Sequence, residues 1–498
     1  MERKEHTLLN VVSTVTLQII TLLSGFMVPK LILGAFGSEV NGLVASITQF
    51  LGYISLIEGG VTSVILANLY KPLATKDNEK VSAVVSTADA FFKKIALFFC
   101  IYQVILAIVY PFVIDSDFGW GYIASMVMIL GLSTLIQYTL SLSWRLLLQA
   151  DKRMYIAVLA QGVSVVLNLI LTFVFIKFGS NIHIVKLISG FAFFVQPLVL
   201  NSYIRKNYSL NKKAKTDSVL LSQRWDGFGI NVAAMIRSSA ATIILSITAS
   251  LSTVSIFSVY TLVSNGLKSL ITSISGGVIP TIGNAYAKGD KETANNLFDM
   301  YEFVMFVVAF FCFTVAAVVM PSFALLYTKG INDANYNRPL LGIILMAAEC
   351  IFCIRDPYVN MAYSAGHFKQ VSKYAYIEAV ITVVVSAVLA LLWGVNGVAF
   401  GLFVSAIYRT ATQVLYLKKN ILFRKASVFI KKFICFAIAS VVCAVVSYVL
   451  FAKPEITIFS WVFYAVKVSL VEIICLLIAC FVSCKKELKT VLKIGEKS

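Results

Sequence analysis

The chain has 498 residues, of which 59% are hydrophobic and only 13% are charged, and its formal net charge is +18. Because soluble domains usually carry about 25% charged residues, this composition excludes an ordinary soluble domain and indicates an integral membrane protein. The positive charge falls in short clusters between apolar runs rather than on one basic face or tail, which excludes a nucleic-acid-binding protein.

Apolar runs recur along the whole chain. A spanning helix needs about 20 mostly apolar residues, and by this criterion the chain predicts about 14 transmembrane helices. The runs that meet near Ser250 and near Val395 are separated only by tight turns. The predicted spans centre near Ile20, Tyr53, Ile105, Leu132, Val166, Phe193, Ala240, Leu270, Val308, Phe352, Val384, Val404, Val442 and Leu470. The expected fold class is therefore an all-α integral membrane protein.

Lys and Arg gather in alternate loops. With both termini placed on one side, 31 of the 42 basic residues fall in the termini and loops of that side, six fall in loops of the other side, and five lie within spans. Short cytoplasmic loops carry an excess of Lys and Arg. The chain is therefore predicted to have both termini in the cytoplasm.

Two segments repeat in one register. The stretch EGGVTSVILANLYK ends at Lys71, and SGGVIPTIGNAYAK ends at Lys288, 217 residues later. Further along, LQADKRMY from Leu148 matches YSAGHFKQ from Tyr363. Both halves start on the same side, so the repeat is parallel. We expect an N-lobe of helices 1 to 6 (1–204), a basic cytoplasmic linker (205–225), a C-lobe of helices 7 to 12 (226–420), and two extra helices with a basic cytoplasmic tail (421–498).

Each half carries a pair of glycines at the same depth, and small residues let helices approach closely in lipid. We therefore expect these glycines to serve helix packing. The acid before the first pair is different, because its counterpart Ser275 is neutral and the repeat does not require a charge there. The residues are Glu58, Gly59, Gly60, Gly276 and Gly277.

Several predicted spans carry polar stripes at helical spacing, and ionisable groups within a span usually face a water-filled cavity or a partner. Arg237 and Lys268 lie in early spans of the second half, and two fixed cations there suit phosphate or carboxylate groups. Snorkelling to the interface is the alternative for both. The polar residues expected to line a cavity are Gln18, Ser55, Asn231, Tyr260 and Ser264.

Other charges within spans have a structural interpretation. Glu349, Arg355 and Asp356 could neutralise one another in the tenth span, and Lys467 and Glu472 near the end of the chain are expected to be structural. The sequence carries no motif that is typical of an enzyme: the histidines lack the spacing of zinc ligands, and there is no glycine-rich phosphate loop. We expect no catalytic residue, no metal site and no cofactor.

The two six-span repeats, the stretch VPKLILGAFGSEVNGLVASITQF and the stretch GNAYAKGDKETANNLF resemble the polysaccharide flippases of the multidrug/oligosaccharidyl-lipid/polysaccharide exporter superfamily. The resemblance covers nearly the whole chain. It implies two six-helix lobes in a V shape around a cavity that opens alternately to each side. In that family, cations from early helices of each lobe bind pyrophosphate or acidic sugars. The matching positions here are Arg237, Lys268 and Lys30.

The chain also departs from relatives within that superfamily. The lipid II flippase has several arginines in its first two spans, where this chain has only Lys30. Drug exporters of the superfamily often place an acid in the first span for ion coupling, where this chain has none, although Glu58 in the second span could substitute. Three roles stay open for Glu58: ion coupling, gating by pairing with Arg237 or Lys268, and a structural hydrogen bond.

The leading hypothesis is a flippase that moves a polyprenyl-pyrophosphate-linked oligosaccharide, on an undecaprenyl pyrophosphate carrier, across the bacterial cytoplasmic membrane. The alternatives are a cation-coupled multidrug exporter and a lipid II flippase, and a membrane-embedded polymerase or ligase would need a large external loop that the sequence lacks. The expected partners are membrane lipids, a polysaccharide polymerase and glycosyltransferases. The chain is expected to act as a monomer.

Overall fold

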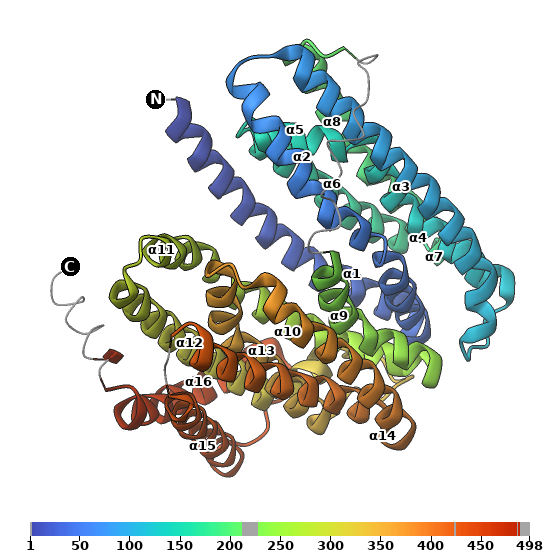
Figure 1. The fold of residues 1–498 in the computed structure, drawn as a ribbon. Coiled ribbons are helices and arrows are strands. Elements are labelled where there is room, and N and C mark those ends of the chain that lie inside the picture. Colours follow the sequence, from blue (N-terminus) through green and yellow to red (C-terminus); the bar gives the residue numbers. More distant parts are fainter. Residues whose placement is uncertain (1, 212–227, 423–424, 486, 489–498) are drawn as a thin grey trace. The chain divides into compact units, whose positions relative to one another are not determined.

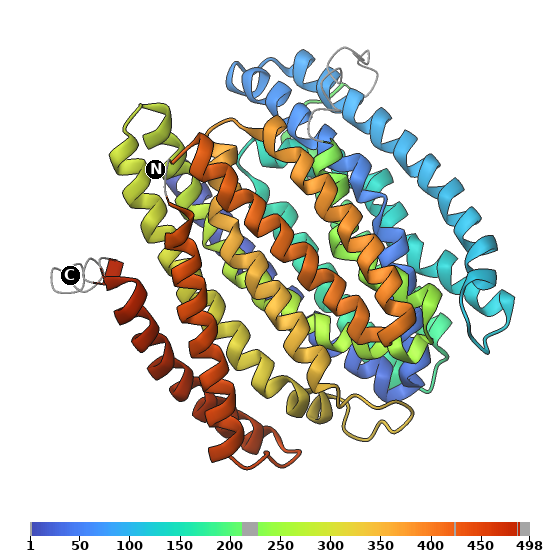
Figure 2. The same cartoon turned by 60° about the horizontal axis from the view of Figure 1, so that its bottom comes forward.

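The structure is a computed structural model that describes residues 2–211, 228–422, 425–485 and 487–488. Figures 1 and 2 show that these residues form helices joined by short connections. The chain divides into two compact units. Unit 1 comprises Met1–Met235 and Ala249–Ser255, and unit 2 comprises Ile236–Thr248 and Ile256–Ser498.

The helices of unit 1 come first along the chain. They are α1 (Glu2–Gly52), α2 (Ser55–Ala74), α3 (Asn78–Val113), α4 (Trp120–Leu140), α5 (Leu142–Ala150), α6 (Met154–Lys177), α7 (Ile182–Phe191), the 3-10 turn η1 (Ala192–Phe194) and α8 (Val195–Asn207). Two further helices, α9 (Phe228–Thr248) and α10 (Leu251–Ser273), contribute residues to both units. The helices of unit 2 are α11 (Ser275–Ala287), α12 (Lys291–Tyr327), α13 (Pro339–Ser364), α14 (Phe368–Asn420), α15 (Ala426–Leu450) and α16 (Ile458–Ser483).

Within the described residues, 11 helices are long and apolar enough to cross a membrane, so the chain is a multi-pass membrane protein. Non-helical backbone at Gly37 and at Gly394 divides α1 and α14, and α14 covers two predicted span centres, Val384 and Val404. All but one of the predicted span centres lie in helical segments. The total of 14 crossings and the side of the termini stay predictions.

The exception is Tyr53, which was expected at the centre of the second span but lies in a break between α1 and α2. The backbone N–H groups of Tyr53, Ile54 and Leu56 each bond the carbonyl three residues earlier. Such bonds form a tighter turn than the α-helix has. Gly52, just before the break, is a weak helix former. The second predicted span is therefore two helical pieces.

The backbone carries the internal repeat that the sequence predicts. Residues with positive φ recur 213 to 215 positions apart, and both non-glycine members are lysines whose partners in the second half are glycines. Glycine takes this conformation without the steric cost that a side chain imposes. The pairs are Lys76 with Gly289, Lys152 with Gly366, and Gly179 with Gly394.

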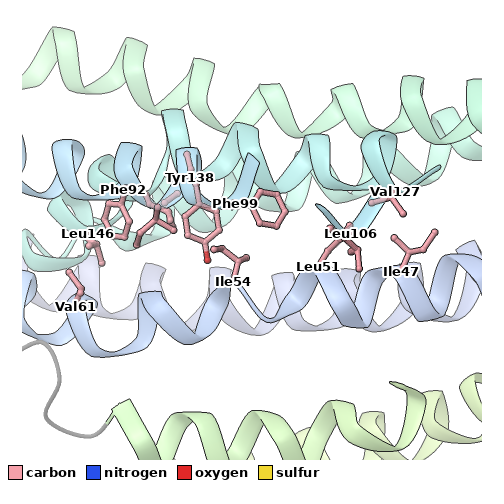
Figure 3. Close-up of a cluster of buried hydrophobic side chains, with 14 of the residues drawn as sticks. Ile47, Leu51, Ile54, Val61, Phe92, Phe99, Leu106, Val127, Tyr138 and Leu146 are labelled. Atoms are coloured by element: carbon pink, nitrogen blue, oxygen red, sulfur yellow. The ribbon is translucent and has the colours of Figure 1, made fainter. Parts of the chain in front are cut away.

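Unit 1 is held by an apolar core between α1 and α2 on one side and α3, α4 and α5 on the other (Figure 3). The side chains come from helices far apart in the sequence and meet at the faces that the helical period brings inward. Residues labelled in Figure 3 include Ile47, Leu51, Val61, Phe92, Phe99, Leu106, Val127, Tyr138 and Leu146.

Unit 2 contains a close helix pair made by the two halves of α14. At Gly394 the backbone turns, with φ of 57°. A Cβ at Gly397 would lie 2.0 Å from the carbonyl oxygen of Leu389, and a Cβ at Gly401 would lie 2.2 Å from Oγ of Ser386. Only glycine fits at such contacts, so these residues let the two halves of α14 pack backbone to backbone.

The paired glycines of the sequence repeat behave differently. Gly276 was expected to allow close helix packing, yet among the described residues no atom lies within 4 Å of the Cβ that would be added there. The close contacts lie instead at Gly397 and Gly401 in unit 2 and at Gly42 in unit 1, where an added Cβ would lie 1.9 Å from the carbonyl oxygen of Leu251. The side chains at Glu58, Gly59, Gly60 and Gly277 lie outside the described part of the structure.

The last two helices pack on α12, as the orange-red and red ribbons of Figure 1 show. Phenylalanines from α12 and α15 stack edge to face in this contact. Lys432 of α15 is buried, and its Nζ lies 2.8 Å from carboxylate oxygens of both Glu302 and Glu487. The two extra helices that the sequence predicts, α15 and α16, are thus joined to the rest of unit 2. The joint consists of aromatic ring contacts and of the ion pairs of Lys432 with Glu302 and Glu487.

Candidate functional site

Four helices bring charged side chains together at one place within unit 2. Arg237 comes from α9, Lys268 from α10, Glu349 and Arg355 from α13, and Glu378 and Arg409 from α14. We call these six residues, together with Phe352, the cationic cluster.

The turn at Gly394 explains how α14 supplies two members of the cluster. Glu378 lies 16 residues before this turn and Arg409 lies 15 residues after it. The two halves of α14 run in opposite directions along each other, so the two side chains arrive at the same depth. Nε of Arg409 lies 3.8 Å from Oε2 of Glu378, and its Nη1 donates to the carbonyl of Val371 at 2.9 Å.

Glu349 bridges the two cations that the sequence singled out. One of its carboxylate oxygens lies 3.4 Å from Nη2 of Arg237, and the other lies 3.3 Å from Nζ of Lys268. Charge-assisted hydrogen bonds are typically about 2.7–2.9 Å long. Oε2 of Glu349 and Nε of Arg237 also make no hydrogen bond within the described residues. Both contacts of Glu349 are therefore loose.

Glu378 is held more tightly. Its Oε1 accepts from Nη1 of Arg355 at 2.6 Å and lies 3.4 Å from Nε of Arg237. With Arg409 on its other oxygen, this single carboxylate faces three guanidinium groups. Glu378 therefore anchors the arginines of three different helices.

Phe352 lies among the cations. Its ring centre is 4.1 Å from Cζ of Arg237, 4.4 Å from Cζ of Arg355 and 5.4 Å from Nζ of Lys268. The negative face of an aromatic ring attracts cations within about 6 Å. Phe352 thus offsets part of the repulsion between like charges without adding a negative charge.

The cluster has more positive than negative groups. Four basic side chains face two carboxylates, which leaves an excess of two positive charges among these residues. Arg237 is 6% exposed, whereas Lys268 is 20% exposed. Buried uncompensated charge is expensive and is normally balanced by a partner. The arrangement can therefore take up an anion with about two negative charges.

Two of the three predicted cations, Arg237 and Lys268, are brought together. Lys30 lies in unit 1, on α1, with an exposed side chain. Glu58 belongs to α2, but its side chain is not among the described ones, so its role stays a prediction.

The polar residues predicted to line a cavity have diverse surroundings. Gln18, Ser55 and Asn231 are exposed. Tyr260 is fully buried, where its hydroxyl donates to the carbonyl of Tyr336 and accepts from the backbone N–H of Arg338, both at 2.9 Å. Ser264 is buried and donates to the carbonyl of Thr261. In this conformation Tyr260 and Ser264 have partners in unit 2, and the lining role stays a prediction.

The charges of the tenth span form no ion pair with one another, and each of them contacts a residue of another helix. Glu349 and Arg355 belong to the cluster, whereas Asp356 accepts hydrogen bonds from Tyr301 at 3.0 Å and from Asn360 at 2.9 Å. Sequence reasoning missed Glu378 and Phe352. A signal for Glu378 was present, because it is the single acidic residue of the predicted eleventh span and stands opposite Arg409 across the turn.

No protein-family model and no curated protein sequence matches the chain. Solved structures do. The chain superposes on the lipid II flippase MurJ in an inward closed conformation with a TM-score of 0.72 and 16% identity, over 93% of this chain and 97% of the other.

Two multidrug transporters share the fold. One is a multidrug resistance MATE family transporter of the MOP superfamily in an inward-facing conformation, with a TM-score of 0.67 and 13% identity over 82% of this chain and 99% of the other. The other is the MATE multidrug transporter DinF-BH, with a TM-score of 0.62 and 15% identity over 84% of this chain and 97% of the other. The chain therefore has the fold of these membrane transporters and flippases.

Proposed function

We propose that this protein is a flippase that moves a polyprenyl-pyrophosphate-linked oligosaccharide from the inner to the outer leaflet of a bacterial cytoplasmic membrane. The observation that carries the proposal is the cationic cluster, with its excess of two positive charges. The pyrophosphate diester of such a lipid has two negative charges at neutral pH, which matches this excess. The fold shared with a lipid II flippase supports the same class of activity.

The loose contacts of Glu349 suggest how the headgroup binds. The pyrophosphate oxygens replace the Glu349 carboxylate on Arg237 and Lys268, while the tight contact of Glu378 with Arg355 stays in place. The guanidinium fork suits two oxygens of one phosphate, and the Lys268 ammonium acts as a point charge. Lys268, the most exposed cation of the cluster, is the first to meet the headgroup.

Alternating access completes the cycle. Glu349 neutralises part of the charge of Arg237 and Lys268 when the site is empty, and pyrophosphate neutralises it when the site is loaded, which lowers the cost of burying these cations in both conditions. The protein can then change between its two open states in either condition, and a difference in affinity between the states sets the direction. Glycosyltransferases that make the lipid-linked unit and a polymerase that consumes it are the expected partners, and the protein itself performs no covalent chemistry.

A cation-coupled multidrug exporter is the competing proposal, because two multidrug transporters share the fold. The cluster contains two carboxylates and an aromatic ring, as a site for lipophilic cations would. Both carboxylates, however, already contact resident basic groups, which outnumber them two to one. The charge balance favours an anionic substrate.

Flipping in proteoliposomes tests the proposal. A labelled undecaprenyl-pyrophosphate oligosaccharide is added to the inner leaflet, and its appearance outside is read with a membrane-impermeant glycosidase. Arg237→Gln with Lys268→Gln should abolish flipping, since loss of a desolvated charge pair costs about 2–5 kcal/mol. Lys467→Gln is the matched control: this cation of α16 lies over the rings of Phe451 and Phe463, outside the cluster.

The outcomes separate the candidate functions. Flipping by the wild type and by Lys467→Gln, together with loss in the double variant, supports the proposal. Flipping that is equal in all three proteins contradicts the cationic site. Transport of a lipophilic cation dye without flipping of the lipid favours the exporter, and flipping of lipid II alone favours the lipid II flippase.

A further inference from the structure

Unit 1 contains a pocket that belongs to none of the features described above. Its volume is about 470 Å³, and it lies where α3, α4, α5 and α8 meet. Ligand pockets usually measure about 300–1,000 Å³. The pocket is therefore large enough to hold the headgroup of a lipid or a similar small group.

The rim of the pocket is basic. Arg205, near the end of α8, has no ion-pair partner among the described residues. Nζ of Lys93 on α3 forms an ion pair with Oδ2 of Asp89 at 2.7 Å. Both basic side chains are exposed. The lining residues thus carry one more positive than negative charge, and a guanidinium is available for a phosphate.

Polar groups line a second part of the pocket. Asn201 of α8 contributes its amide, and Ser82 at the start of α3 accepts a hydrogen bond from the backbone N–H of Asn211 at 3.0 Å. This bond ties the chain after α8 to the second turn of α3. The polar lining therefore comes from both ends of this connection, α8 and α3.

The remaining wall is apolar and open. Leu140 and Leu198 both line the pocket, and they are 44% and 62% exposed. They belong to candidate membrane spans, where exposed leucines contact hydrocarbon. Trp144 also lines the pocket, and tryptophan is enriched at the membrane–water interface. A ligand with a phosphate at one end and an acyl chain at the other matches this combination of basic, polar and apolar lining residues.

We propose that this pocket binds an anionic phospholipid of the leaflet that faces the basic loops, with its phosphate at Arg205 and Lys93 and its acyl chains along Leu140 and Leu198. Basic pockets between transmembrane helices on the cytoplasmic side commonly take such headgroups. The site is separate from the cationic cluster, and its occupation does not depend on what the protein transports.

Quenching of Trp144 by brominated lipids tests the site. The full-length protein is placed in phosphatidylcholine nanodiscs in which a small fraction of the lipid is brominated phosphatidylglycerol or brominated phosphatidylcholine. The fluorescence difference between the wild type and Trp144→Phe isolates the contribution of Trp144. We expect phosphatidylglycerol to quench Trp144 more strongly than phosphatidylcholine at the same fraction.

The chain offers matched controls one residue away. Arg205→Gln or Lys93→Gln should each lower the relative affinity for phosphatidylglycerol about fivefold, the effect of one basic residue near an anionic lipid surface. Lys206→Gln and Lys94→Gln remove the same charge from exposed positions that do not line the pocket, and they should leave the preference unchanged.

Three results would overturn the proposal. Equal quenching by the two lipids means that the pocket does not select an anion. An equal effect of Lys206→Gln and Arg205→Gln means that general surface charge, and not the pocket, attracts the lipid. Loss of the preference on addition of millimolar inorganic phosphate means that the pocket takes a free phosphate ion and not a lipid.

Discussion

Arg355 donates to Glu378 across 2.6 Å, from α13 to α14, and both side chains are buried. The contacts of Arg237 and Lys268 with Glu349 are 3.4 Å and 3.3 Å long. Since charge-assisted hydrogen bonds strengthen as they shorten to about 2.7–2.9 Å, the cluster contains one tight pair, Arg355 with Glu378, and four longer contacts, two of which are those of Glu349. The tight pair holds the helices, and the loose pairs of Glu349 are the ones that a ligand can replace.

The tight pair should be structural. Arg355→Gln leaves Glu378 with weaker partners, and removal of one member of a buried pair typically destabilises a protein by about 3–5 kcal/mol. We expect a clear fall in the thermal unfolding temperature, measured in detergent by intrinsic fluorescence. Glu378→Gln should destabilise the protein at least as much, because this carboxylate also faces Arg237 and Arg409. A variant Arg355→Gln as stable as the wild type would show that the pair contributes nothing.

The loose pairs should compete with the substrate. Glu349→Gln removes the carboxylate that balances Arg237 and Lys268 in the empty state, so the empty protein should be less stable and pyrophosphate should bind more tightly. A ligand that binds only the folded state stabilises it. Inorganic pyrophosphate should therefore raise the unfolding temperature of Glu349→Gln more than that of the wild type. An equal rise in both proteins would contradict the competition.

The close contact inside α14 predicts a steric effect. In Gly401→Ala the new Cβ would lie 2.2 Å from Oγ and 2.6 Å from the backbone N of Ser386, so the two halves of α14 must separate. We expect a loss of stability and of ligand binding together, because Glu378 and Arg409 lie on the two halves. Gly34→Ala is the matched control, since no described atom lies within 4 Å of its added Cβ. Both variants are compared by unfolding temperature and yield of folded protein.

Two helix caps outside the spans predict the response to acid. The backbone N–H of Lys80 holds the pKa of Asp77 below its ordinary value of 3.8, and hydrogen bonds from Thr293 lower the pKa of Asp290 in the same way. A lowered pKa in the folded state gives stability that is present above pH 3.8 and is lost as the pH falls through the folded-state pKa.

Asp77→Asn and Asp290→Asn keep a capping oxygen but remove its titration. The double variant should lose less stability than the wild type when unfolding is followed from about pH 6 down to about pH 3, because the carboxylates of the wild type become protonated as the pH falls. Asp117→Asn changes a loop carboxylate that caps no helix and should follow the wild type. Parallel acid curves for all three proteins would rule out the caps as the source.

The role of Glu58 is open to a direct test. Glu58→Gln keeps the shape of the side chain but cannot change its charge. If Glu58 couples transport to an ion, flipping by the variant in proteoliposomes should no longer respond to an imposed proton or sodium gradient. A retained response with slower substrate release would favour gating, and unchanged transport in every respect would leave a structural hydrogen bond.

The sequence predicted those features of the fold that depend on neighbours along the chain. The span positions follow from apolar runs, and the tight turns near Ser250 and Val395 follow from the short distance between two such runs. The repeat is visible in the sequence because both halves carry a Gly-Gly-Val motif and a lysine in one register, and the structure adds matching backbone turns, as at Gly179 and Gly394. The break at Tyr53 was missed because a short turn inside an apolar run leaves the hydropathy of that run unchanged.

The partners of the charges could not be predicted in the same way. Arg237 and Lys268 were recognisable as unusual for their spans, but their contact with Glu349 depends on how α9, α10 and α13 pack. Adjacent charges such as Arg355 and Asp356 suggested pairing within one helix, although neighbours along a helix point about 100° apart. Each in fact pairs across to another helix, which only the tertiary structure determines.

The turn at Gly394 also bears on how the chain enters the membrane during synthesis. The two halves of α14 are joined without a long polar loop, and their glycines fit against the opposite backbone, so we expect them to enter the lipid as one hairpin. An Arg alone at the centre of a span costs about 2.5–3.5 kcal/mol on the insertion scale. In the hairpin, Arg409 arrives already facing Glu378, so the most deeply buried arginine of the cluster need not be inserted as a lone charge.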